Sequence, residues 1–339
     1  MTHSDLPSRT HANTEPSAPN TLSVGVVGVG AMGTNHARIY HELHGVDLVG
    51  VTDHDRGRAR TVATRYGTSA QTLDGLLARC DAVSVAVPTA AHYETVKRCL
   101  DAGVAVLVEK PITADPASGR ELAERARESG IVLQVGHVER FNPAVETLAS
   151  MIDDLEVIAV DAARLGPPVD RTGSDGVVLD LMIHDVDVVQ SLLDGEPTAV
   201  CANRTADGQH ATATVEFGDV ISTFTASRIT QRKVRTLAVT AADCLIEVDY
   251  RDQSIAVYRD SYPEFVDTDA VRYRHESVIE RPEVQSREPL RTELEAFVSA
   301  VRNDEEPPVT PAAGLSALRT VRAIDRQATA DDAVEVRGT

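Results

Sequence analysis

Lysine is almost missing from this sequence of 339 residues, whereas acidic residues are abundant. Only Lys97, Lys110 and Lys233 carry an ammonium group, and the formal net charge is -19. An acidic surface repels phosphate backbones, which excludes nucleic-acid binding through a basic face. Hydrated carboxylates and screened repulsion suit a salt-rich cytoplasm, so we interpret the protein as halophilic. An acidic protein from an ordinary GC-rich organism is the alternative.

Long apolar runs and paired cysteines are also missing. No run approaches the roughly 20 apolar residues that span a bilayer, so no membrane partner is expected. The four cysteines lie far apart without a CxxC pair, and the histidines show no ligand spacing, so no disulfide or metal site is predicted. A reducing cytoplasm fits this usage best. Residues 1–20 are polar, contain three prolines and resemble no signal peptide, which predicts a flexible tail.

Residues 21–136 alternate between strand-like and helix-like segments. Short valine-rich runs predict buried parallel strands: LSVGVVG, VDLVGVTD, AVSVAVP, AVLVEK and IVLQVG. Amphipathic stretches such as AMGTNHARIYHEL and HYETVKRCLDAG lie between them. This order predicts an α/β domain with a doubly wound parallel sheet, the Rossmann arrangement that binds dinucleotides.

Residues 137–339 follow a different rhythm and are predicted to form a second domain. Segments such as HATATVEFG and VISTFTASR alternate polar and apolar residues, as in an antiparallel sheet with one wetter face. One helix-like segment, residues 177–193, interrupts the strands, and two helices at residues 289–303 and about 311–327 close the chain. The length of the chain suits two domains better than one.

A glycine motif, GxGxxG, joins the first predicted strand to the first helix. Gly28 permits the tight turn, Gly30 lets the backbone approach a pyrophosphate, and Gly33 lets helix and strand pack closely. The N–H groups at the start of this helix would face the phosphates, which adds Ala31 and Met32 to the predicted cofactor contacts.

An acidic residue follows the motif at the distance expected of a ribose ligand. Asp53 ends the second predicted strand, and its carboxylate would bond the ribose hydroxyls and repel a 2′-phosphate. The sequence therefore favours NAD over NADP. Arg56 and Arg58 lie close by, and an arginine there could accommodate the extra phosphate, so NADP stays open.

The segment VLVEKPIT ends the predicted strand at residues 105–110. Ligands of open α/β sheets bind beyond the carboxyl ends of the strands, where Glu109, Lys110 and Pro111 fall. A lysine held there can donate to a substrate hydroxyl and stabilise the developing alkoxide. The alternative is an ordinary surface lysine at a strand end.

The segment LDLMIHDVDVV, residues 179–189, carries four ionisable groups in an apolar helix. Asp180 and His184 share a helical face, and a histidine can take a hydroxyl proton near neutral pH. Asp185 and Asp187 could serve a site or only the helix surface.

Taken together, the motifs VGVVGVGAMG, VAVPTAAHYE, VEKPI and DLMIH resemble, in order, those of the glucose–fructose oxidoreductase, inositol dehydrogenase and MocA-like (Gfo/Idh/MocA) family. The resemblance implies a nicotinamide-dependent sugar dehydrogenase that forms a homodimer or homotetramer through its open C-terminal sheet. It implies that Lys110, Asp180 and His184 are catalytic. The implied cofactor contacts include Pro88, Thr89, His92, Glu109 and Lys110.

The segments VGHVERFNPAV and RLGPPVDRTGSDGVVLDLMIH resemble those of nucleotide-sugar members, the UDP-N-acetylglucosamine 3-dehydrogenases. That resemblance implies oxidation of a sugar 3-hydroxyl to a ketone. A diphosphate favours arginines, so Arg140, Arg164 and Arg171 are candidate substrate ligands; structural ion pairing is the alternative for each. Asn142 could contact a sugar hydroxyl or cap the helix beginning at Pro143.

Two other functions stay open. An inositol or free-sugar dehydrogenase of the same family would need hydroxyl-binding groups but no diphosphate ligands. A nicotinamide-binding regulator without catalysis ranks lower, because the proton-handling groups Lys110, Asp180 and His184 are all present.

Overall fold

The computed structural model describes residues 21–329, apart from 169–175, 262–263, 268–269 and 274–275. Its first sheet is parallel, with the strand order β2-β1-β3-β4-β5. The strands are β1 Leu22–Val27, β2 Val46–Thr52, β3 Ala82–Val85, β4 Ala105–Glu109 and β5 Leu133–Gly136. All five lie within the segments that the sequence predicts, and the doubly wound sheet is confirmed.

Five helices connect these strands among the described residues. They are α1 Ala31–Glu42, α2 Arg56–Arg65, α3 Leu73–Leu77, α4 His92–Asp101 and α5 Pro116–Ser129. The local sequence sets their ends. Asp115 caps α5 by accepting from the backbone N–H groups of Ala117 and Ser118, and Gly130, at φ 64°, ends it.

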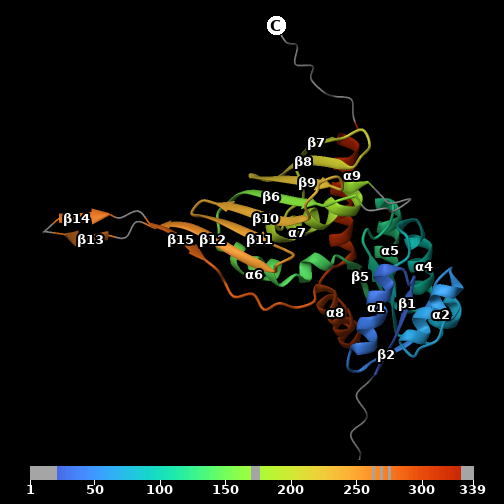
Figure 1. Cartoon of the computed structure of the whole chain (residues 1–339). Helices are drawn as coiled ribbons and strands as arrows, with labels where there is room; N and C mark the ends of the chain where they lie inside the picture. Colours follow the sequence, from blue (N-terminus) through green and yellow to red (C-terminus); the bar gives the residue numbers. More distant parts are fainter. Residues whose placement is uncertain (1–20, 169–175, 262–263, 268–269, 274–275, 330–339) are drawn as a thin grey trace, which may run out of the picture.

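The second sheet is larger and mostly antiparallel, as predicted, with the order β15-β12-β11-β10-β6-β9-β8-β7. Only the β6–β9 pair is parallel among its described pairings. Its strands are β6 Val157–Leu165, β7 Ala199–Arg204, β8 His210–Phe217, β9 Val220–Ser227, β10 Val234–Ala241, β11 Cys244–Asp249, β12 Ser254–Ser261 and β15 Glu276–Glu280. The short hairpin of β13 Glu264–Asp267 and β14 Ala270–Tyr273 extends away from the body (Figure 1).

Helices cover one face of this second sheet. The helix α6 Pro143–Ile152 packs on β11 and β12, α7 Ile183–Leu193 on β6 and β9, and α9 Pro311–Gln327 on β7. Strand β8 shows why one face is covered, because Ala211, Ala213, Val215 and Phe217 alternate with more exposed residues. None of the helices that the structure describes is long and apolar enough to cross a membrane.

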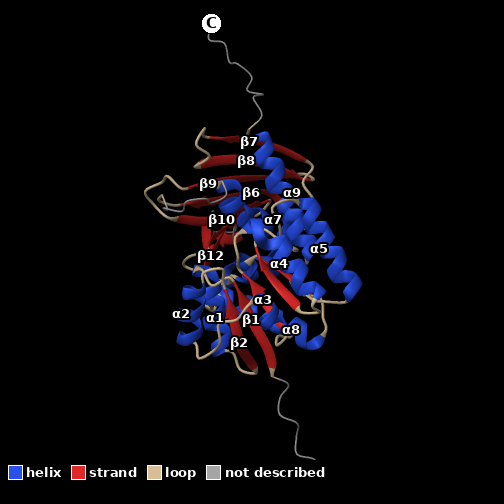
Figure 2. Cartoon of the chain, turned by 90° about the vertical axis from the view of Figure 1, so that its right-hand side faces the viewer, coloured by secondary structure: helices blue, strands red, loops and turns tan. Residues whose placement is uncertain are grey.

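The two closing helices pack against elements around the first sheet, which joins the two parts of the molecule (Figure 2). The helix α8 Pro289–Asn303 buries Leu294 and Phe297 in one cluster with Ile39 and Tyr40 of α1. The helix α9 contacts both α5 and β5. Apolar burial along these contacts fixes the carboxyl ends of the first sheet against the helices that cover the second.

Candidate active site

The glycine loop after β1 has the shape needed to hold a dinucleotide. Gly28 adopts φ 86°, and a Cβ on Gly33 would lie 1.8 Å from the Gly28 carbonyl oxygen, so only glycine fits there. A Cβ on Gly30 would meet no atom within 4 Å, which leaves this backbone open to a ligand. The helix α1 begins at Ala31 without a capping side chain, so its first N–H groups are available for phosphates.

Asp53 lies against this loop. Its Oδ2 accepts from the Val29 N–H at 2.8 Å, and its Oδ1 accepts from the Asp55 N–H at the same distance. The Arg58 Nη1 stands 3.6 Å from Oδ2, and His54 Nδ1 is 3.0 Å from Oδ1. The carboxylate is therefore placed beside the loop with an arginine near it, and the residues fit a nicotinamide dinucleotide without distinguishing NAD from NADP.

The loops after β3 and β4 are joined by His92. Its Nδ1 lies 2.8 Å from the Pro111 carbonyl oxygen and its Nε2 lies 2.9 Å from that of Val87. Burial lowers the pKa of His92, so the ring is neutral and donates to only one of these oxygens at a time. His92 thus links the loop that carries Pro88 and Thr89, at the 3-10 turn η1 Thr89–Ala91, to the Lys110–Pro111 peptide bond, which is cis.

The Glu109 side chain contacts helix α1. Its Oε1 lies 3.0 Å from the Nε2 of His36, which is fully buried. Although burial acts to raise it, the pKa of Glu109 is lowered, because the His36 hydrogen bond and the charges of His36 and Lys110 stabilise the carboxylate. The predicted cofactor contact at Glu109 is thus held ionised next to Lys110.

Lys110, which directly follows β4, contacts Asp180, which lies far away along the chain. The Lys110 Nζ donates to the Asp180 backbone oxygen at 2.7 Å and to its Oδ1 at 2.8 Å. Arg228 binds the other carboxylate oxygen. Burial acts to raise the pKa of Asp180, but the two cations outweigh it and lower that pKa. In the described part of the chain, the Asp180 carboxylate therefore contacts Lys110 and Arg228 rather than the imidazole of His184.

His184 lies in the first turn of α7, which directly follows a π-helical turn. The predicted helix at residues 177–193 consists of a π-helical turn, η3 Val178–Met182, followed by α7. The His184 Nδ1 is buried without a hydrogen-bond partner among the described residues, while part of the side chain stays exposed. Burial first, and then the charges of Lys110 and Arg164, lower the pKa of His184 well below its usual value. The imidazole is therefore neutral at physiological pH and able to accept a proton.

Asp185 and Asp187 are not on the helix surface, which corrects one of the two options that the sequence allowed. Their exposed fractions are 2% and 1%. Asp185 accepts both donors of a bidentate Arg164 pair at 2.8 and 2.7 Å. Asp187 does the same for Arg140 at 2.8 and 2.7 Å.

The arginines predicted to hold a diphosphate therefore have protein partners. Arg164 also donates to Glu139 at 2.7 Å, and only 2% of it is exposed. The ion-pairing alternative describes the contacts of Arg140 and Arg164, while Arg171 lies outside the described residues. Asn142 caps α6 by accepting from the Ala144 N–H at 3.2 Å, and its amide donates to the Tyr250 carbonyl at 2.9 Å.

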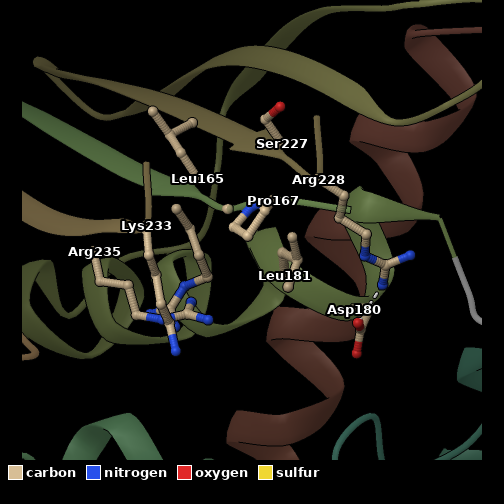
Figure 3. Close-up of a pocket in the computed structure, with 10 residues that line it drawn as sticks. Leu165, Pro167, Asp180, Leu181, Ser227, Arg228, Lys233 and Arg235 are labelled. Carbon is tan, nitrogen blue, oxygen red and sulfur yellow. Dashed lines mark hydrogen bonds and ion pairs between the residues drawn. The ribbon is translucent and has the colours of Figure 1, made fainter. Parts of the chain in front are cut away.

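A pocket of about 300 Å³ opens beside Asp180, at the ends of β6, β9 and β10 (Figure 3). Its lining holds four cationic side chains, and the sequence interpretation missed three of them: Arg228, Lys233 and Arg235. A signal for Arg235 existed, because in RTLAVTAA it occupies the same alternate positions as the buried Leu237 and Val239. An arginine on the inward face of a strand indicates a partner there. No metal-binding group of His, Cys, Asp or Glu occurs in the described part of the chain.

Comparisons with known proteins agree with this geometry. Residues 22–137 match the family model for an oxidoreductase family with an NAD-binding Rossmann fold, and residues 168–336 match its C-terminal alpha/beta domain. The UDP-N-acetylglucosamine 3-dehydrogenase of Acidithiobacillus ferrooxidans is 31% identical over 287 residues, or 83% of this chain and 88% of the relative.

Two further proteins are similar to this chain, and one of them is a solved structure. A solved structure of UDP-N-acetylglucosamine 3-dehydrogenase from Acidithiobacillus ferrooxidans superposes with a TM-score of 0.82 at 29% identity, covering 90% of this chain and 97% of that one. The inositol 2-dehydrogenase of Rhizobium meliloti is 32% identical over 191 residues, or 54% of this chain and 58% of the relative. The chain therefore belongs to the Gfo/Idh/MocA family of oxidoreductases, whose N-terminal domain binds a nicotinamide cofactor.

Proposed function

We propose that this protein oxidises the 3-hydroxyl of UDP-N-acetylglucosamine to a ketone, with NAD as the cofactor. The observation that carries the proposal is the contact between Lys110 and Asp180 at the edge of a cation-lined pocket, with the neutral His184 one helical turn after Asp180. The similarity to a UDP-N-acetylglucosamine 3-dehydrogenase over most of both chains supports it. Asp53 beside the glycine loop favours NAD, because its carboxylate repels a 2′-phosphate.

The cofactor, Lys110 and His184 have separate roles in the proposed oxidation. The bound nicotinamide supplies the acceptor for the hydride that leaves the carbinol carbon. Lys110 has three N–H donors, of which Asp180 accepts two, and the third is positioned for the reacting oxygen. The neutral His184 takes the hydroxyl proton, and the Lys110 charge stabilises the oxygen as its negative charge develops.

The test is turnover by the purified protein with NAD or NADP, at low and at high salt, on a panel of neutral and nucleotide-linked sugars. We expect reduced NAD to form with UDP-N-acetylglucosamine, and mass spectrometry to show a product lighter by two hydrogens. A ketone trap or an aminotransferase draws the oxidation forward if its equilibrium is unfavourable. Turnover of free sugars or polyols alone contradicts the proposal.

An inositol dehydrogenase is the second candidate, because inositol dehydrogenases are among the relatives. The same panel separates the two. A neutral polyol uses Lys110 and His184 but makes no demand on the cationic pocket.

A further inference from the structure

The pocket beside Asp180 concentrates positive charge in a strongly acidic protein. Four of its lining side chains are cationic, Arg164, Arg228, Lys233 and Arg235, and Asp180 is its one lining carboxylate among the described residues. The chain as a whole has a net charge of -19. A local excess of the opposite sign focuses an attractive potential on anions.

Two of these cations are already compensated. Arg164 has the carboxylates of Asp185 and Glu139, and Arg228 has that of Asp180. In the described part of the chain, neither Lys233 nor Arg235 has a carboxylate partner within ion-pair distance. The pocket cations without an ion-pair partner in the described part of the chain are therefore these two residues, at the start of β10, although the carboxylates of Glu139 and Asp185 still act on Arg235 from a greater distance.

The strand register makes Arg235 unusual. It stands directly opposite Arg164 in the β6–β10 pair, where like charges destabilise a sheet. Its Nη1 is buried without a hydrogen-bond partner among the described residues. Burial, followed by the charge of Arg164, lowers the pKa of Arg235. A buried donor that lacks an acceptor costs free energy, which an anionic ligand would offset.

Lys233 and Arg235 approach the pocket from one side, while the Arg228–Asp180 pair closes the other (Figure 3). Pro167 and Leu181 line the space between them. Asp180 is also the residue that binds Lys110, so the pocket adjoins the place of the reacting hydroxyl. A group bound here would lie beside a sugar whose hydroxyl reacts at Lys110.

From this geometry we infer that Lys233 and Arg235 form the seat of the substrate's diphosphate, an inference that rests on the proposed nucleotide-sugar function. The planar guanidinium of Arg235 can bind two phosphate oxygens, and the Lys233 ammonium acts as a mobile point charge at the exposed edge. A neutral polyol leaves the buried Arg235 donor without an acceptor, so the pair selects for phosphorylated sugars. Arg140 and Arg164 are already paired with the carboxylates of Asp187 and Asp185.

The experiment compares Lys233→Met and Arg235→Met with Arg232→Met, an exposed neighbour that does not line the pocket. We expect the KM for UDP-N-acetylglucosamine to rise about tenfold or more in the first two variants, with kcat little changed, because a charge-assisted hydrogen bond is lost. Calorimetric titration with UDP should show the same loss of affinity, whereas titration with uridine should not. Arg232→Met should match the wild type in all three measurements.

Folding is checked separately, because Arg235 is partly buried. Arg235→Lys keeps the charge but loses the bidentate fork, and exposed Lys233 can be reversed to glutamate without disturbing a core. Thermal melting of each variant separates misfolding from weaker binding. Unchanged UDP affinity in a folded Lys233→Glu variant would overturn the inference.

The outcomes for the inference and for the proposed function differ. If the wild type oxidises UDP-N-acetylglucosamine and the variants keep its KM, the diphosphate seat is wrong and the function stands. If another phosphorylated sugar is the substrate and its KM depends on Lys233 and Arg235, the seat stands and the sugar assignment is wrong. If only neutral polyols react, and equally in all variants, both fail.

Discussion

The cofactor side and the substrate side of this site are built in different ways. The glycine loop offers backbone N–H groups from one continuous segment. Its key residues are glycines, whose missing Cβ leaves room for the backbone and for a ligand. The substrate side offers side chains from the ends of β4, β9 and β10 and from η3, and ion pairs between distant segments hold Lys110, Asp180 and Arg228 in place. A phosphate-binding loop can therefore be recognised from one continuous motif. A charged cleft cannot, because it depends on the register of several strands.

The largest effect should come from breaking a buried ion pair on the substrate side. Asp185→Asn removes one of the two carboxylates that pair with Arg164, which is only 2% exposed. We expect the free energy of unfolding to fall by about 3–5 kcal/mol, measured by urea denaturation. Exposed Asp101, which pairs with Lys97 and Arg125, supplies the control, and Asp101→Asn should cost much less stability. Equal small losses would show that the buried ion pair of the substrate side holds the fold no more strongly than an exposed one.

Removing the lysine should separate catalysis from cofactor binding. Lys110→Met eliminates the donor to the reacting oxygen, and we expect kcat to fall about 100- to 1,000-fold. Fluorescence titration should show that reduced nicotinamide still binds, because the glycine loop is untouched. Lys97→Met changes another of the three lysines at an exposed site and should leave kcat unchanged. A loss below tenfold would place the reacting oxygen elsewhere.

Two glycine variants test the backbone side. Gly33→Ala places a Cβ 1.8 Å from the Gly28 oxygen, so we expect a loss of about 1–3 kcal/mol in stability together with weaker cofactor binding. Gly30→Ala meets no protein atom and should melt like the wild type while binding the cofactor less tightly. If Gly30→Ala bound the cofactor normally, the phosphates would not approach the loop at this residue.

The pH dependence should show the smallest effect. The pKa of His184 is lowered in the folded protein, so its base form persists below the usual histidine value of about 6.5. The acid limb of kcat/KM should therefore lie below that value. Below about pH 6.5, His184 binds a proton in the unfolded chain but not in the folded protein. The free energy of unfolding should therefore fall as the pH drops through about 6.5. His184→Gln should lose activity and show a weaker fall in stability. An acid limb at or above the usual value would contradict this.

Much of the fold followed from local patterns. The valine-rich runs gave β1 to β5, and the alternation in HATATVEFG marked the inward face of β8. The site was only partly predictable. The sequence placed Asp180 and His184 on one helix, but it did not show that Asp180 binds Lys110 or that Asp185 is buried, because both facts depend on residues that are far away along the chain. It also overlooked Arg235, whose importance appears only opposite Arg164.

By itself, the sequence determined the order of strands and helices and the glycine loop, since each depends on contacts within a few residues. The tertiary structure alone decided which cations are compensated. Carboxylates of α7 reach Arg140 and Arg164, while the antiparallel register of β6 and β10 leaves Arg235 beside a like charge. Electrostatic energy depends on separation in space rather than in sequence, and the fold sets that separation.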